Sequence, residues 1–262
     1  MPLSYPKIFS LEGRTAVITG GTRGIGAAMA VALAEAGADV ILIQRDESNK
    51  KTHNEVQSLG RKSTIYTADL ASQSDVASLT KRILDDKHDP SILITCAGIQ
   101  RRHPSHEFPQ SDWDEVIQVN LTTVFTLCRD LGAYMLTRTP AASGHRGSII
   151  NVASLATFQG AFTVPAYASA KGGVGQLTKA LSNEWACKGI NVNAIAPGYV
   201  ATDMNEALIN NPERAPQILQ RIPAGRWATP EDFKGPTIFL ASEASLYVSG
   251  EILTVDGGWM GR

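Results

Sequence analysis

The sequence predicts an α/β fold in which a doubly wound parallel sheet carries helices on both faces. Short apolar runs alternate with helical segments along most of the 262 residues, and a glycine-rich turn follows the first run. Polar residues or glycines follow several later runs. Strands that alternate with helices form parallel sheets through right-handed crossovers. Ligands of such sheets bind at the carboxyl ends of the strands.

Seven strands are expected, and the helices lie between them. The strands are predicted at 14–19, 40–43, 63–67, 91–95, 148–152, 191–195 and 252–255. Helices are predicted at 27–36, 49–59, 75–87, 112–137 and 164–188. Nothing in the composition marks a boundary, so residues 1–262 are expected to form a single domain. Residues 197–229 form a long connection broken at Asn210-Asn211-Pro212, which predicts a lid over a site at about 199–229.

Composition narrows the class of partner. With 43% hydrophobic residues, 19% charged residues and a net charge of -1, the chain shows no bias toward nucleic acid or membrane. Small molecules or copies of the chain are the expected partners, and no metal site is predicted. Cys96, Cys128 and Cys187 have no paired spacing, which favours a reducing compartment. Residues 1–10 contain no apolar run, and no segment approaches the ~20 apolar residues of a membrane span, so we expect a cytoplasmic protein.

The first turn has the features of a phosphate-binding site. Gly20-Gly21-Thr22-Arg23-Gly24-Ile25-Gly26 stands between the first strand and the first helix. Glycines let the backbone approach a pyrophosphate closely, and the helix N-terminus offers free N–H groups and a favourable dipole. The alternative is that the glycines serve tight packing alone.

Tyr167 and Lys171 stand four residues apart, one helical turn from each other on the same face. A cation beside a phenol favours the phenolate and brings its pKa toward neutrality. Taken alone, the pair is typical of a packed ring beside a solvated lysine. However, Asp69, Gly98, Ser154 and Pro197-Gly198 follow other strands directly, so they are expected to line one crevice.

Together these motifs resemble the classical short-chain dehydrogenase/reductase family over essentially the whole chain. The resemblance rests on Thr19-Gly20-x-x-x-Gly24-Ile25-Gly26, Gly98, Asn120, Ser154, Tyr167-x-x-x-Lys171 and Pro197-Gly198. It implies a single-domain Rossmann-type fold. It also implies hydride transfer between a nicotinamide cofactor and a secondary alcohol or its ketone.

The resemblance also implies roles for individual residues. Tyr167 would be the catalytic acid or base, and Ser154 would hydrogen-bond the reacting oxygen. Lys171 would lower the pKa of Tyr167 and hold the ribose hydroxyls, while Asn120 would hold a water that links Lys171 to solvent. The alternative for Asn120 is a satisfied buried amide in a bent helix. The implied cofactor contacts are Gly20, Thr22, Arg23, Gly24, Ile25, Gly26, Arg45, Asp69, Leu70, Cys96, Ala97, Gly98, Tyr167, Lys171, Pro197, Gly198, Val200 and Thr202.

One segment departs from the family pattern. Thr95-Cys96-Ala97-Gly98 stands where the family usually has Asn-Asn-Ala-Gly. The backbone contact to the cofactor can survive the change, whereas a stabilising side-chain hydrogen bond is in question. We expect Cys96 to be a small buried apolar residue and not a redox sensor.

Charge at the end of the second strand indicates which cofactor binds. An acidic residue there accepts hydrogen bonds from the ribose of NAD, whereas a basic residue accommodates the 2′-phosphate of NADP. This chain has Gln44-Arg45 at that position, and Arg23 can reach the same phosphate. NADP is therefore predicted. The alternatives are arginines that are solvated or paired with Asp46 and Glu47, and NAD bound through Asp46.

The crevice further resembles 2-deoxy-D-gluconate 3-dehydrogenases and gluconate dehydrogenases, which implies a sugar acid as substrate. The matching segments are 98–102, 158–160, 196–199, 221–227 and 255–259. Arg101 and Arg102 can grip a carboxylate through paired hydrogen bonds, unless they form a solvated basic loop. Ser154, Gln159 and Tyr167 complete the implied substrate site.

Two other functions remain open at this stage. One is reduction of 3-oxoacyl chains on a carrier protein, although no concentrated basic surface for an acidic carrier is visible. The other is a non-catalytic, cofactor-binding regulatory protein, since a fold does not determine a function. The family resemblance implies a homotetramer or homodimer packed through the two long helices and the C-terminal strand.

Overall fold

The computed structural model describes residues 7–262, which form one parallel sheet in the order β3-β2-β1-β4-β5-β6-β7. This order confirms the predicted doubly wound sheet. The chain moves outward from β1 to β3 and then returns to β4, so a switch point lies between β1 and β4. The strands are β1 (Thr15–Thr19), β2 (Asp39–Gln44), β3 (Ser63–Thr67), β4 (Pro90–Thr95), β5 (Gly147–Val152), β6 (Ile190–Pro197) and β7 (Ile252–Val255).

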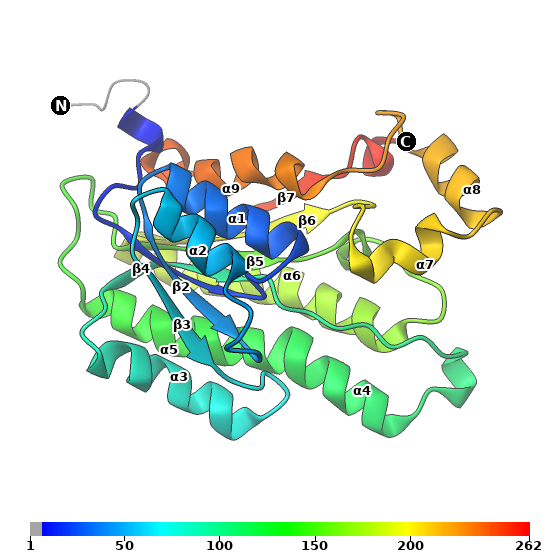
Figure 1. The fold of residues 1–262 in the computed structure, drawn as a ribbon, viewed down its shortest axis with the longest axis horizontal. Coiled ribbons are helices and arrows are strands. Elements are labelled where there is room, and N and C mark those ends of the chain that lie inside the picture. The colour runs from blue at the N-terminus through cyan, green and yellow to red at the C-terminus, as the bar shows by residue number, and fades with distance from the viewer. Residues whose placement is uncertain (1–6) are drawn as a thin grey trace.

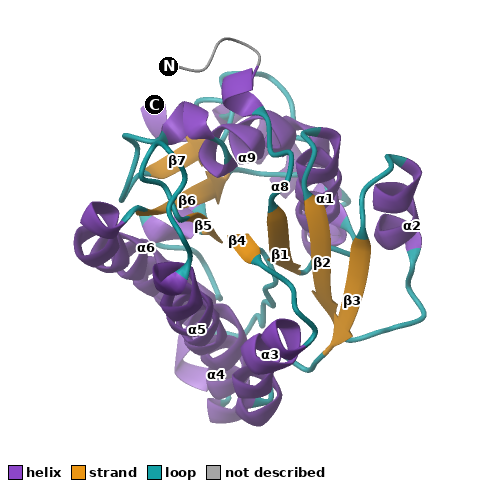
Figure 2. Ribbon diagram, turned by 90° about the vertical axis from the view of Figure 1, so that its left-hand side faces the viewer, coloured by secondary structure: helices purple, strands orange, loops and turns teal. Residues whose placement is uncertain are grey.

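Helices cover both faces of the sheet (Figure 2). One face carries α3 (Gln73–Asp85), α4 (Gln110–Ile117), α5 (Thr123–Thr137) and α6 (Pro165–Trp185), and the other carries α1 (Gly24–Glu35), α2 (Lys51–Ser58) and α9 (Lys234–Ala241). Two short helices, α7 (Glu206–Ile209) and α8 (Arg214–Arg221), lie beyond the end of the sheet toward which the β6 arrow points (Figure 1).

Each face of the sheet has its own hydrophobic core. Val17 of β1 packs with residues of α3, α5 and α6, whereas its neighbour Ile18 packs with residues of α1 and α9. Both side chains are fully buried. Because both faces are covered, central strands such as β2 and β4 read as continuous apolar runs instead of alternating ones.

Two features differ from the expected helices. The helix expected at 112–137 is divided by a π-helical turn, Gln118–Thr122, between α4 and α5. In addition, α9 was not predicted, because it contains Gly235 and Pro236. Pro236 stands in the first turn of α9, where a backbone N–H has no partner within the helix, so proline is tolerated there.

Residues 1–6 of the amino-terminal stretch, for which no targeting segment was expected, lie outside the described residues. Within residues 7–262, no helix is both long enough and apolar enough to cross a membrane.

Candidate active site

The glycine turn is shaped by close approaches that only glycine permits. Gly20 has a φ of 70°, and a Cβ there would lie 2.8 Å from backbone atoms of Ala97. A Cβ on Gly26 would lie 2.2 Å from the carbonyl oxygen of Gly20. The N–H of Ala97 donates to Thr19 Oγ1 at 3.1 Å, which ties the turns after β1 and β4 together.

The start of α1 fits an anion. Its N-cap residue, Arg23, makes no side-chain capping hydrogen bond. The Arg23 side chain therefore leaves the backbone N–H groups of the first helical turn free. Gly20 and Gly26 keep the turn free of side-chain atoms beside these groups. The residues present therefore fit the pyrophosphate of a dinucleotide, because both free donors and close backbone access are available.

Ser154 and Tyr167 meet at the carboxyl end of β5. Ser154 caps the short 3-10 helix Leu155–Thr157, and its hydroxyl lowers the pKa of Tyr167 on α6. Thr157 Oγ1 accepts a hydrogen bond from the N–H of Ser154 at 3.3 Å and donates to the carbonyl oxygen of Lys171 at 2.9 Å. Thr157 thus links the serine turn to the helix that carries Tyr167 and Lys171. The sequence analysis did not single it out, although the Ser-x-x-Thr spacing is that of a capping box.

Lys171 is buried, with 3% of its surface exposed. Its Nζ donates to the carbonyl oxygen of Val152 at 2.6 Å and lies 5.7 Å from the centre of the Tyr167 ring. Burial lowers the pKa of Lys171 to about 8. The fold therefore holds this ammonium beside the phenol, as the one-turn spacing predicted.

The pKa of Tyr167 does not follow the expectation. Burial raises it above its ordinary value, and the groups that lower it are Ser154 and Arg102. Lys171 was expected to lower it. Instead, the ammonium is directed to a backbone carbonyl and lies over the ring, and its own charge is weakened by burial.

Asn120 lies in the π-helical turn and is fully buried. Its Oδ1 accepts from the N–H of Ile99 at 2.9 Å, and its Nδ2 donates to the carbonyl oxygen of Ile99 at 2.8 Å. A Cβ on Gly98 would lie 3.4 Å from Asn120 Oδ1 and 3.9 Å from Lys171 Nζ. The side chain is therefore a satisfied amide that holds the loop after β4 close to Lys171.

The departure at Thr95-Cys96 is compensated within the core. Thr95 Oγ1 donates to Oδ1 of Asn151 at 2.8 Å, and Asn151 Nδ2 donates to Thr178 Oγ1 at 3.0 Å. A buried hydrogen bond thus joins β4 to β5 without the usual asparagine. Burial raises the pKa of Cys96 to about 11, so its thiol stays protonated at neutral pH.

The residues at the end of β2 leave one cation unpaired. Gln44 Nε2 donates to the carbonyl oxygens of Asp46 and Asn49, and the Asp46 carboxylate accepts from the N–H and Oγ of Ser48. Within residues 7–262, exposed Arg45 forms no ion pair. Arg23 pairs instead with Asp203 at 2.9 Å, a partner that no sequence pattern pointed to.

The remaining cofactor candidates lie around the same edge. A Cβ on Gly24 would lie 3.4 Å from the methyl group of Thr202, which brings the glycine turn and the chain after β6 together. Val200 is buried and forms a β-bridge with Ala228. The others are Thr22, Ile25, Pro197 and Gly198, which are partly buried, Asp69, which is exposed, and Leu70, which is buried.

The two arginines after β4 have different surroundings. Arg101 donates to Glu115 Oε2 at 2.7 Å and also lies 3.8 Å from Asp112, so carboxylates of α4 already occupy its guanidinium. Arg102 is exposed, donates to Gln100 Oε1 at 2.7 Å, and acts on the pKa of Tyr167 through its charge. Of these two arginines, Arg102 is thus the one without a carboxylate partner among residues 7–262.

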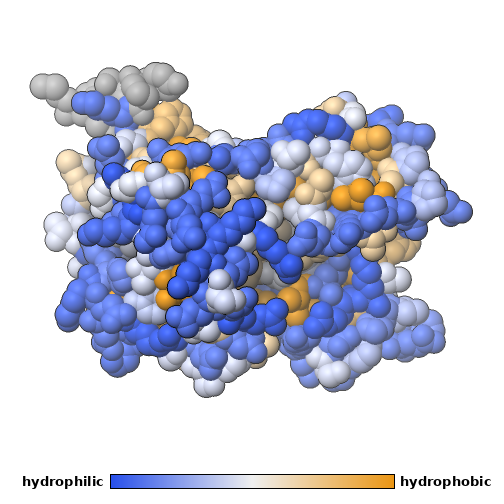
Figure 3. Space-filling view, in the orientation of Figure 1, coloured by the Kyte–Doolittle hydropathy of each residue, from blue (hydrophilic) through white to orange (hydrophobic). Residues whose placement is uncertain are grey.

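An aromatic cluster fastens residues 199–229 to the C-terminus. The ring of Tyr199 lies 5.5 Å from Trp227 and 4.7 Å from Trp259, and the Arg221 guanidinium stacks on Trp259 at 4.1 Å. Trp259 Nε1 donates to Gln159 Oε1 at 3.4 Å. Apolar side chains show on the surface in the region of α7 and α8 (Figure 3), and Met204 and Leu219 are exposed in this segment.

Comparisons with known proteins identify the family to which the chain belongs. A family model described as enoyl-(acyl carrier protein) reductase matches residues 20–260. The 2-dehydro-3-deoxy-D-gluconate 5-dehydrogenase of Pseudoalteromonas atlantica is 50% identical over 97% of this chain and 98% of its own. A Burkholderia cenocepacia gluconate 5-dehydrogenase, solved with NADP and tartrate, is 37% identical with a TM-score of 0.90, covering 97% of this chain and 98% of its own.

A second solved structure is similarly close. It is an Agrobacterium tumefaciens protein with bound NADP, provisionally described as a 2-deoxy-D-gluconate 3-dehydrogenase. It is 46% identical with a TM-score of 0.89, and the match covers 97% of this chain and 99% of that one. With the ordered motifs, the sheet topology and these relatives in agreement, the chain belongs to the short-chain dehydrogenase/reductase family, a family of oxidoreductases that act on CH–OH groups.

Proposed function

We propose that this protein is an NADP-dependent dehydrogenase/reductase that interconverts a secondary alcohol and a ketone on a sugar acid. We further propose 2-dehydro-3-deoxy-D-gluconate as its substrate and carbon 5 as the reacting carbon, because the relative with 50% identity has that activity in its name. The observation that carries the substrate class is exposed Arg102, whose charge acts on Tyr167 beside Ser154.

In this proposal the four catalytic candidates have distinct roles. Tyr167 takes the proton from the substrate hydroxyl, or returns one to the ketone oxygen, while Ser154 hydrogen-bonds that oxygen. Lys171 holds the ribose hydroxyls, and Asn120, whose side-chain amide is held by Ile99, keeps the loop after β4 beside Lys171. NADP, when bound, supplies the nicotinamide that accepts or gives the hydride.

The charges at the end of β2 support NADP over NAD. Arg45 is exposed and unpaired within the described part of the chain, so it is free to meet a 2′-phosphate. Ser48 donates to Oδ1 of Asp46 only, so the preference for NADP rests on the free Arg45 and not on a blocked Asp46 carboxylate. Arg23 would join Arg45 on the phosphate only by leaving Asp203.

A spectrophotometric screen of sugar acids with both cofactors tests the function. We expect turnover of 2-dehydro-3-deoxy-D-gluconate with NADP, and tighter binding of NADP than of NAD in a fluorescence titration. Arg45→Gln should weaken NADP at least about tenfold, since a charge-assisted hydrogen bond contributes about 1.5–3 kcal/mol, and should leave NAD unchanged. Lys50→Gln, at a nearby exposed cation, is the control. Turnover of neutral polyols only, or tighter NAD binding, would contradict the proposal.

Removing the free arginine after β4 tests the contact with the substrate carboxylate. Arg102→Ala should raise the KM for sugar acids by about 10-fold or more and leave the KM for neutral polyols unchanged, because a charge-assisted contact to the carboxylate is lost. Arg101→Ala is the matched control, because its guanidinium is already held by Glu115. Steady-state kinetics measure the KM of both variants for sugar acids and for neutral polyols. Equal effects of the two substitutions would exclude a specific role for Arg102.

The proposal also includes a lid, a cellular location and an oligomeric state. Residues 199–229 would act as a lid, which the Arg23–Asp203 ion pair and the contacts of Tyr199 and Trp227 support. A cytoplasmic location is supported by three free cysteines. The protein would form a homotetramer or homodimer, which light scattering of the purified protein tests.

Reduction of 3-oxoacyl chains on a carrier protein is the weaker candidate. An acidic carrier would need a basic docking surface near the crevice. Of the two arginines after β4, Arg101 is neutralised by Glu115 and Asp112, and only Arg102 remains exposed. A single free guanidinium suits a small carboxylate better than an acidic protein.

A further inference from the structure

A cavity of about 220 Å³ lies at the end of the sheet opposite the candidate active site. Arg14, which precedes β1, Ser91 near the start of β4, and His145, which precedes β5, line it together with Arg138 and Arg146. All of these positions are at the amino ends of strands or at the end of α5. The catalytic candidates, in contrast, stand at the carboxyl ends.

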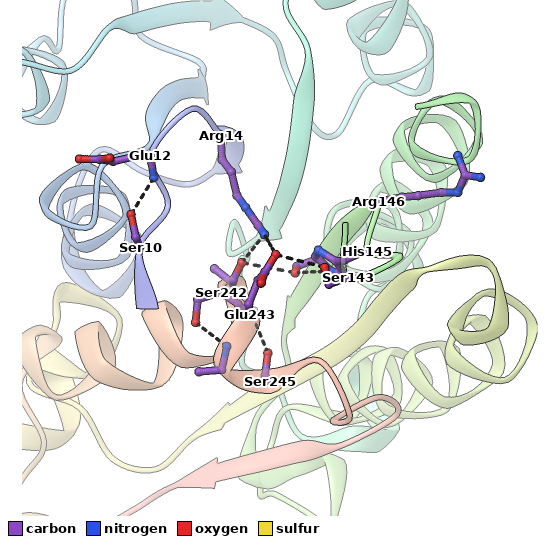
Figure 4. A network of polar contacts seen from close by, with 12 residues as sticks. Ser10, Glu12, Arg14, Ser143, His145, Arg146, Ser242, Glu243 and Ser245 are labelled. Atoms are coloured by element: carbon purple, nitrogen blue, oxygen red, sulfur yellow. Dashed lines mark hydrogen bonds and ion pairs between the residues drawn. The ribbon is translucent and has the colours of Figure 1, made fainter. Parts of the chain in front are cut away.

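Arg14 supplies a largely buried cation to this cavity. Its side chain is 16% exposed, and its Nη1 donates to the carbonyl oxygen of Ala241 at 3.0 Å. Its Nη2 lies 3.7 Å from Glu243 Oε1, which is longer than a hydrogen bond. Figure 4 shows Arg14 directed toward Glu243, and Ser143 and His145 lie beside Glu243. The guanidinium therefore keeps unused donor capacity.

The guanidinium of Arg138 acts on Arg14 as a second positive charge. Arg138 is paired with Asp89 at 2.6 Å, but the Asp89 side chain is 62% exposed and so lies toward solvent. Burial lowers the pKa of Arg14, the Glu243 carboxylate partly offsets this, and the positive charge of Arg138 lowers the pKa further. Arg146 points away from Arg14 and His145 (Figure 4). An anion between Arg14 and Arg138 would relieve the repulsion between these two guanidiniums.

Ser91 provides an independent sign of a ligand. It is 3% exposed, and its Oγ has no hydrogen-bond partner within residues 7–262. A buried hydroxyl without a partner is unfavourable, because it has lost its hydrogen bonds to water. His145, on the same cavity, is neutral near pH 7 because burial and the charge of Arg14 lower its pKa to about 4. The cavity therefore contains a buried cation and an unused hydroxyl donor.

We propose that this cavity binds a small oxyanion, a phosphate or a carboxylate, that accepts hydrogen bonds from the Arg14 guanidinium and the Ser91 hydroxyl. Such an anion would join the starts of β1, β4 and β5 to the end of α9, where Ala241 lies. It would therefore stabilise the folded protein and would not compete with a dinucleotide at the glycine turn.

Isothermal titration calorimetry with inorganic phosphate tests this site, with acetate in a parallel arm to distinguish the two kinds of oxyanion. The titrations are done with saturating NADP, so that phosphate cannot occupy the glycine turn. Ser91→Ala should weaken binding of the preferred anion about tenfold, because one hydrogen bond to a charged group is lost. The variant should fold normally, since its hydroxyl has no protein partner to lose.

Ser63→Ala is the matched control, because Ser63 Oγ is also buried without a partner but does not line the cavity. It should bind the anion as the unmodified protein does. Arg14→Gln should weaken binding further, and if that variant fails to fold, Ser91→Ala decides alone. The proposal is overturned if neither anion binds the unmodified protein, or if Ser91→Ala binds as tightly as Ser63→Ala.

Discussion

Tyr167→Phe is expected to lower kcat about 10³-fold while NADP still binds. The phenol is the only proposed proton donor at the reacting oxygen, and general acid–base catalysis contributes about 10²–10⁴-fold. The ring that packs beside Lys171 is retained in the variant, so the cofactor pocket should keep its shape. Stopped-flow or steady-state absorbance of the nicotinamide measures turnover, and fluorescence titration measures NADP binding.

The control for this variant is Tyr247→Phe, because Tyr247 is fully exposed and distant in sequence from every proposed site residue. It should retain ordinary activity. If Tyr167→Phe also kept ordinary activity, the assignment of the acid or base would be wrong. If it lost NADP binding together with turnover, the phenol would be needed for cofactor binding and its catalytic role would be untenable as stated.

Gly20→Ala is expected to abolish measurable dinucleotide binding and to reduce the free energy of unfolding by about 3 kcal/mol. A Cβ at this position would lie 2.8 Å from the backbone of Ala97, and the residue has a φ of 70°. The turn must therefore move away from the chain after β4, which breaks the cradle for the pyrophosphate. Denaturant unfolding measures the stability, and fluorescence titration measures the binding.

Gly13→Ala distinguishes the cost of a positive φ from the cost of the steric contact between a Cβ at position 20 and Ala97. Gly13 has a φ of 74°, close to that of Gly20, but no atom lies within 4 Å of a Cβ built there. We expect a loss of about 1 kcal/mol and unchanged cofactor binding. Similar losses in the two variants would mean that strain, and not the contact with Ala97, makes glycine necessary at position 20.

Local pattern alone was sufficient for the sheet and for the catalytic motifs. The central strands are buried on both faces, so their apolar runs are visible without any knowledge of their neighbours. Tyr167 and Lys171 are placed together by helical spacing, and Ser154 is brought to them because it ends a neighbouring strand of a parallel sheet. These relations depend on short-range geometry and on one topological rule.

The π-helical turn at Asn120 and helix α9 could not be predicted in the same way. The turn is accompanied by two hydrogen bonds between Asn120 and Ile99, which stand 21 residues apart. Helix α9 contains Gly235 and Pro236, and its burial against α1 outweighs their low helical propensity. Tertiary contacts decided both features.

The partners of charged side chains were decided only by the tertiary structure. Arg101 and Arg102 are neighbours in sequence, yet α4 brings Glu115 to one and leaves the other exposed. Arg23 meets Asp203, which is 180 residues away. Burial, which no local pattern reports, raises the pKa of Tyr167 and lowers that of Lys171. Sequence alone therefore determined the fold and the family and proposed the reacting groups, whereas long-range packing decided which charges are free, because charges interact through space and not along the chain.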